Sequence, residues 1–188
     1  MQKEFKEGLE LFSSDLQFKY DFYYKQYSEL YSKLYAIIIQ SEYVRHFLSL
    51  TKGTEQDFDT APFIEISYKA IINKIFPDIK IQTGEGLKDS ISKFNKIQLC
   101  NYIINNGEYA TQKLLKLAIA YRYAYSHYAG NEENSNSPYE EIANGEELRL
   151  IREMVCCIVS EYNYFRKELK MNYNKEELDK GIPLLKEN

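Results

Sequence analysis

Arg122 and His127 are the two residues of this chain whose types and spacing best suit catalysis. The chain has five arginines and two histidines, and these two lie five residues apart in the stretch AIAYRYAYSHYAG, residues 118–130. Histidine titrates near neutral pH, so it can give or accept a proton, and arginine offers a permanent charge in a planar, bidentate fork. An acid–base group beside a fixed cation suits chemistry at a phosphoryl centre.

The spacing of Arg122 and His127 raises a geometric problem. Five residues correspond to about 140° around an α-helix, so the two side chains would not meet on one regular face. They converge only if the helix frays near Ser126, or if a second copy of the chain supplies the complement. Both arrangements are compatible with the sequence.

Arg122 is also in phase with apolar residues of the same helix. It follows Leu115, Ala118 and Ile119 by seven, four and three residues, which predicts that it shares their buried face. A guanidinium is costly to bury unless it is paired, and such breaks in a local pattern are expected at functional sites. The alternative is a structural pair between Arg122 and a buried Asp or Glu.

Other side chains of this stretch could contact a substrate. Tyr123 and Tyr128 could stack on nucleic-acid bases, or they could pack at helix–helix or dimer seams, which is the commoner use of tyrosine. Lys116 adds positive charge to residues 107–128, where Glu108 is the one acidic residue. Ser126 is a small residue directly before the histidine. We therefore place Lys116, Tyr123, Ser126 and Tyr128 in the candidate substrate-binding set.

The remaining candidate groups predict no further site. Neither histidine has a Glu-x-x-His or HExxH pattern, so we expect neither a metal nor a cofactor. His46 shares a stripe with Tyr43 and Phe47, which predicts a histidine at the edge of the core with one satisfied hydrogen bond. The three cysteines, at positions 100, 156 and 157, form no zinc or disulfide spacing, so we expect small apolar core residues.

The composition indicates a folded protein of the cytoplasm. The net charge is −4 and the pI about 5.4, which does not favour a globally basic, nucleic-acid-binding surface but leaves room for a local basic site. No apolar run approaches the roughly 20 residues that span a membrane. The first residues have no apolar core of a signal peptide, and the cysteines suit a reducing compartment.

The apolar spacing is helical along most of the chain and predicts an all-α bundle of four to five helices. A single domain over residues 1–188 is expected, with its core at about 15–170 and a loosely attached tail at 171–188. The first helix, or pair of helices with a kink, should begin at Ser13, Ser14 or Asp15 and end at Lys52–Gly53. Its buried face is expected at a stripe of residues spaced by three and four, namely Tyr27, Leu30, Tyr31, Leu34, Tyr35 and Ile38. The other helices are expected at about 60–76, 89–105 and 108–129, then from a capping box at Ser137–Glu140, and from Gly145 to Leu169.

The R-x4-H motif of Arg122 and His127, near the end of a core helix in a small all-α chain, resembles the HEPN superfamily, whose defining motif is R-x4-6-H. The small Ser126 and the polar loop GNEENSNS after the motif are similar to the abortive-infection branch of that superfamily. The resemblance in architecture covers about residues 15–170. In residues it rests on Arg122 and His127.

This resemblance implies a metal-independent endoribonuclease, a toxin or anti-phage defence component, whose site lies between two protomers. The ribose 2′-OH would be the nucleophile, His127 the acid–base group and Arg122 the cation that stabilises phosphoryl charge. The implied partners are RNA, a second copy of the chain, and an antitoxin or neighbouring defence protein, with no membrane.

Two other functions are compatible with the same residues. Some HEPN domains bind nucleotides or RNA without cleaving, and Tyr123 stands where many active members have Asn, Asp or His. The chain could also be a plain helical interaction protein.

Overall fold

The computed structural model describes residues 2–52, 57–64, 95–128 and 138–185, and within these the side chains of 13–47, 49–50, 57–64, 95–126 and 144–185. Every regular element in these ranges is a helix, which confirms the all-α fold class. The predicted helix at about 60–76 falls mostly outside these ranges. Its proposed start is wrong, because Thr60 lies in a turn and residues 61–64 are not helical.

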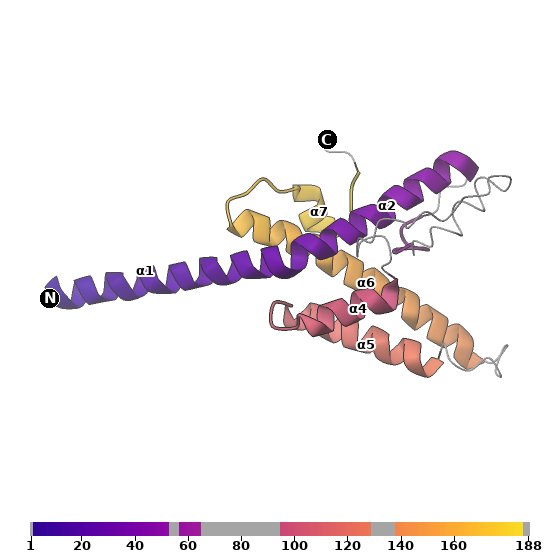
Figure 1. Ribbon diagram of the computed structural model, residues 1–188, viewed down its shortest axis with the longest axis horizontal. Coiled ribbons are helices and arrows are strands. Elements are labelled where there is room, and N and C mark those ends of the chain that lie inside the picture. The colour runs from indigo at the N-terminus through magenta and orange to yellow at the C-terminus, as the bar shows by residue number, and fades with distance from the viewer. Residues whose placement is uncertain (1, 53–56, 65–94, 129–137, 186–188) are drawn as a thin grey trace, which may run out of the picture.

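The first described range, residues 2–52, is one bent helical rod (Figure 1). It comprises α1 (Gln2–Lys25), a π-helical segment η1 (Gln26–Tyr31) and α2 (Ser32–Lys52). The rod reaches Lys52, and residues 53–56, directly after the predicted end, lie outside the described residues. Ser13, Ser14 and Asp15 do not begin the helix, which runs back to Gln2. In the π segment the Ser32 N–H donates to the Tyr27 carbonyl, five residues earlier.

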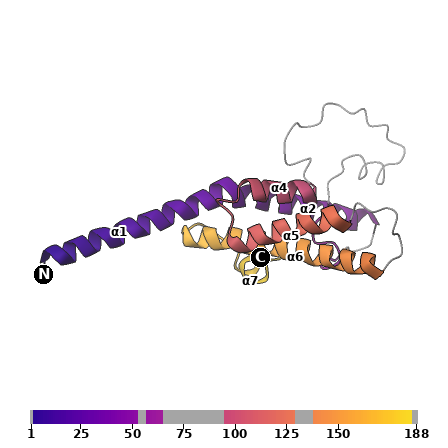
Figure 2. The same cartoon turned by 90° about the horizontal axis from the view of Figure 1, so that it is seen from below.

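The rod and α4 (Lys96–Asn105) lie in one layer, over a second layer of α5 (Gln112–Tyr128), α6 (Pro138–Glu168) and α7 (Lys175–Lys180) (Figure 2). Asn95 begins α4 with a reciprocal capping box to Gln98. The predicted break at Asn144–Gly145 is wrong, because α6 continues through both residues. Ser137, the expected cap before α6, lies outside the described residues.

Apolar side chains from all the long helices meet between the two layers. The stripe predicted on the rod is confirmed, since Leu30, Tyr31, Leu34 and Ile38 are fully buried there. Cys100 and Cys157 are buried and Cys156 is half-buried, as expected for free cysteines in a core. Large fully buried side chains of the other helices are Leu99 and Ile103 of α4, Leu114 and Tyr121 of α5, and Ile151, Met154, Ile158 and Phe165 of α6.

The C-terminal segment is firmly attached, which corrects the expectation of a loose tail. Glu177 of α7 is 1% exposed, and its carboxylate accepts hydrogen bonds from the Tyr35 hydroxyl, the Asn163 amide and the Leu184 N–H, at 2.8–2.9 Å. Gly181 then turns the chain with a positive φ, at 68°. A short helix with a polar anchor can thus be fixed without a large apolar face.

Candidate functional site

The candidate site is carried by α5, whose first turn is tied to the core. The Thr111 hydroxyl accepts the Leu114 N–H at 3.2 Å and so caps the helix. The same hydroxyl donates to the Glu161 carboxylate of α6 at 2.8 Å, and the Tyr31 hydroxyl donates to that carboxylate at 2.6 Å. These contacts fix the rotation of α5, and therefore which of its side chains face solvent.

Arg122 is exposed, so its predicted place on a buried apolar face is wrong. The buried face of α5 is instead formed by Leu114, Leu117, Ala118, Tyr121 and Ala124. The cause is that α5 carries apolar residues nearly all round, so the spacing gave the helical period but not which side is inward. Ile119, taken as a core neighbour of Arg122, is 47% exposed.

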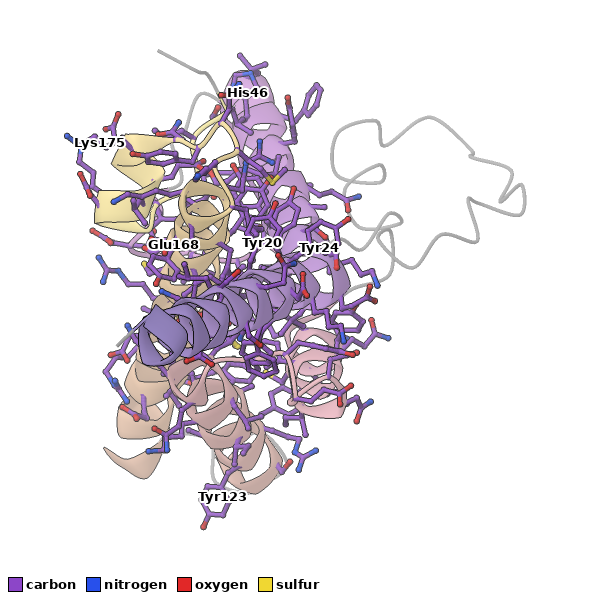
Figure 3. The ribbon with its side chains drawn as sticks, turned by 90° about the vertical axis from the view of Figure 1, so that its left-hand side faces the viewer. Tyr20, Tyr24, His46, Tyr123, Glu168 and Lys175 are labelled. Carbon is purple, nitrogen blue, oxygen red and sulfur yellow. The ribbon has the colours of Figure 1, made fainter. Side chains whose placement is uncertain are left out.

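Arg122 belongs to an outward arc of α5 that also carries Ile119, Tyr123 and Ser126. Tyr123 is 60% exposed and extends away from the bundle (Figure 3). Lys116 is also exposed, and it lies seven residues, or about two turns, before Tyr123 on the same side of the helix. The structure therefore brings four of the candidate residues, Arg122, Tyr123, Ser126 and Lys116, onto one solvent-facing side of one helix.

The helix remains regular through the motif. The backbone is helical to Tyr128, and the Ser126 hydroxyl donates to the Arg122 carbonyl at 2.8 Å, a bond that follows the helical ladder. Fraying at Ser126, the first way for Arg122 and His127 to converge, is thus not observed. The side chains of His127 and Tyr128 lie outside the described residues, but position 127 is about 140° around the helix from Arg122.

The electrostatics of Arg122 distinguish it from the other four arginines. Each of the others is held by a carboxylate or a carbonyl, whereas the Arg122 guanidinium has no hydrogen bond or ion pair within the described part of the chain. The charge of Arg122 acts on the Cys100 thiol of α4. Burial raises the pKa of the Cys100 thiol to about 12, and the charge of Arg122 partly offsets that rise.

His46 is not at the core edge as predicted, because it is exposed near the end of α2. Tyr43 and Phe47, which share its stripe, are 49% and 58% exposed. Sequence analysis missed the neighbouring Arg45, which is 9% exposed and donates through Nε and Nη2 to Glu42. Arg45 and His46 line a cavity of about 490 Å³ that also reaches Leu185.

Arg45, which lines this cavity, has a structural role. The Arg45 guanidinium also donates to the Asp57 carbonyl at 3.2 Å and lies over the Phe58 ring at 5.7 Å. Its charge is therefore satisfied by the chain itself. The arginine ties α2 to the loop at residues 57–64, where the Ile64 N–H donates to Ser41.

The described ranges contain no cluster of three or more residues that could ligate a metal. In the same ranges no helix is long and apolar enough to cross a membrane. No protein-family model, curated protein or solved structure matches the chain.

Proposed function

We propose that this chain is a metal-independent endoribonuclease of the HEPN type, acting as a toxin or an anti-phage defence component in the cytoplasm. The observation that carries the proposal is the state of Arg122. A structural arginine would be paired with a carboxylate, but the Arg122 guanidinium is exposed without a described partner, five residues before His127.

The chemistry requires only groups that the motif and the RNA supply. The 2′-OH of the ribose attacks the adjacent phosphorus, and the bond from phosphorus to the 5′ oxygen breaks. Histidine accepts the 2′-OH proton or protonates the leaving 5′ oxygen, and arginine stabilises charge on the phosphoryl oxygens. The products are a 2′,3′-cyclic phosphate and a 5′-hydroxyl.

A composite site in a homodimer solves the geometric problem of the motif. On a regular helix Arg122 and position 127 lie at opposite edges of the outward arc, so one copy cannot bring both to the same phosphate. Two copies related by a two-fold axis, with these arcs facing each other, would offer the arginine of each to the histidine of the other. Exposed Ile119 at 47% suits such a contact.

Tyr123, Tyr128 and Lys116 would complete the RNA contacts. The exposed Tyr123 ring can stack on an unpaired base, an interaction worth about 1–3 kcal/mol per base. Lys116 would neutralise backbone phosphate, so binding should weaken as salt rises. Ser126 would support the helix that carries Arg122, since its hydroxyl donates a hydrogen bond to the Arg122 carbonyl.

The decisive experiment incubates pure protein with single-stranded RNA in EDTA. Arg122→Ala should lower the cleavage rate by about 10²–10³-fold, as for loss of one preorganised donor, and Arg122→Lys should also impair it. The melting temperature should not change, because the side chain is exposed. Arg149→Ala is the matched control, because Arg149 is also exposed on a helix but is paired with Glu146. Full cleavage by Arg122→Ala would falsify the proposal.

A mixing experiment tests the composite site. Arg122→Ala and His127→Ala should each be inactive, but an equilibrated mixture forms heterodimers in which one of the two sites has both residues intact. About a quarter of the wild-type activity should then return. A mixture as inactive as its components would mean that the site lies within one copy.

The exposure of Tyr123 next to Arg122 also favours a second candidate, an RNA-binding module without activity. In that case RNA binding would survive EDTA, would fall in Tyr123→Ala and Arg122→Ala, and no cyclic-phosphate product would appear.

A further inference from the structure

The first part of α1 projects beyond the bundle as a free helix (Figures 1 and 2). Residues 13–22 are all exposed, and this includes Leu16 at 52% and Phe18 at 74%. The ion pair of Lys19 with Glu168, at 4.0 Å, lies at the end of α6 and marks where the bundle stops. We call residues 2–19 the arm.

The arm has apolar residues in the spacing of a coiled-coil seam. Positions 5, 9, 12, 16, 19 and 23 alternate steps of four and three residues, and five of the six are apolar: Phe5, Leu9, Phe12, Leu16 and Tyr23. At its inner end this seam is already used, because the Tyr23 ring packs edge-on against Phe165 of α6 at 5.5 Å. The arm therefore continues an existing helix–helix contact past the end of its partner.

We infer that the arm pairs in an antiparallel coiled coil with the arm of a second copy of this chain. The partner helix would take the place along the seam that α6 vacates after Glu168. This contact is separate from the outward arc of α5, so it does not depend on the proposed ribonuclease site.

Side-chain size selects a second copy in the antiparallel orientation. The seam alternates phenylalanine and leucine, and antiparallel pairing places one of each in every layer: Phe5 with the partner's Leu16, and Leu9 with the partner's Phe12. Parallel pairing would instead stack phenylalanine on phenylalanine and bring the two Lys19 charges together. It would also force both bundles to the same end of the coil.

The size of this contact is sufficient for a specific dimer. Two arms overlapping over residues 2–19 run together for about 27 Å. A phenylalanine buries about 150–250 Å² when enclosed, so the four phenylalanines at the seam positions of the two arms, with the four leucines at seam positions, bury on the order of 1,000 Å². Specific interfaces begin near that area.

Sedimentation of the full chain over a range of concentrations tests the contact. Leu16→Lys places a charge inside the seam and should weaken self-association about tenfold or more. Gln17→Lys adds the same charge one residue on, outside the seam, and should leave it unchanged. Ile119→Lys tests the α5 contact separately. Association that is insensitive to Leu16→Lys would overturn the inference, whatever happens to RNA cleavage.

Cross-linking tests the orientation. Phe5→Cys and Leu16→Cys are made as separate proteins and oxidised alone and as a mixture, with the wild-type chain as a control for its own cysteines. Antiparallel pairing should give a disulfide-linked dimer only in the mixture, because the two positions face each other across the seam. A dimer from either protein alone would indicate parallel arms and contradict the inference, as would a monomer under all conditions.

Discussion

The two ends of the chain solve the problem of attachment in opposite ways. The C-terminal segment, residues 174–185, has a helix of only six residues, yet its position is fixed by one buried carboxylate that accepts three donors. The N-terminal arm belongs to a helix of 24 residues with many aromatic side chains, yet residues 13–22 are exposed. Length and apolar content therefore do not decide which end is held.

What decides attachment is whether complementary groups are available on the body. The Tyr35 hydroxyl and the Asn163 amide face the C-terminal segment and donate hydrogen bonds to its Glu177 carboxylate. A donor that the attached segment covers and leaves unpaired would cost about 1–3 kcal/mol. The Glu177 acceptor therefore stabilises the attachment of the segment. The arm finds no such surface, because α6 ends opposite Lys19.

Removing the anchor carboxylate should have the largest effect on this contrast. Glu177→Ala should lower the free energy of unfolding by about 3–5 kcal/mol, because it leaves the Tyr35, Asn163 and Leu184 donors without their acceptor. Denaturant unfolding measures the loss. Glu176→Ala is the control, since its partner Lys180 forms a surface pair worth less than about 1 kcal/mol. Equal effects would show that the anchor is not Glu177.

Gly181→Ala should have the next largest effect. A Cβ at this position would lie 2.8 Å from the Cys156 carbonyl oxygen, and the backbone has a φ of +68°. Strain and the close contact together should cost about 1–3 kcal/mol. Gly145→Ala is the matched control, because a Cβ there meets nothing within 4 Å and should stabilise α6 by about 1 kcal/mol or less. The same denaturant curves decide it.

Alkaline pH should weaken the C-terminal attachment by a smaller amount. Burial, and then the hydrogen bond and charge of Glu177, raise the pKa of Tyr35 above its ordinary value of 10. A group with a raised folded pKa contributes stability below its unfolded pKa and loses it above, so unfolding should become easier as pH rises past about 10. Tyr35→Phe should reduce this slope. An unchanged slope would contradict the assignment, although Tyr31 contributes in the same direction.

The smallest effect is expected on the arm. Phe18 is 74% exposed, and its ring centroid lies 6.5 Å from that of Phe22. Phe18→Ala should therefore change the free energy of unfolding by less than about 0.5 kcal/mol. Phe165→Ala is the comparison: its side chain is 2% exposed, and the loss should be about 3–5 kcal/mol. A large loss at Phe18 would mean that the arm is held by the body.

The sequence predicted the helical class and the inward stripe of the rod because one face there is clearly more apolar than the rest. It failed for α5, where Leu115 and Ile119 on one side compete with Leu114, Leu117 and Tyr121 on the other. Periodicity fixes the pitch of such a helix, but contacts with other elements choose its inward side. For α5 those contacts are hydrogen bonds of Thr111 to Tyr31 and Glu161, residues distant in sequence.

The C-terminal anchor has a local sequence signal for an ordered helix. Asn174 caps α7, Glu176 and Glu177 follow in its first turn, and Gly181 ends it. That pattern predicts an ordered short helix. The burial of Glu177 could not be read in the same way, because its donors lie on α2 and α6. Arg122 and His127 were found by residue type and spacing, but the exposure of Arg122 depends on the whole bundle.

The π-helical segment at Gln26–Tyr31 bears on how this chain tolerates insertions and deletions. A bond from residue i to i+5 accommodates one residue more per turn than the ordinary helical bond. Losing one residue here, such as the half-buried Ser28, would leave a plain α-helix with the same orientation on both sides. Losing one within the arm would rotate everything before it by about 100° and turn its apolar seam away. A one-residue deletion at this junction would therefore leave the direction in which the arm faces unchanged.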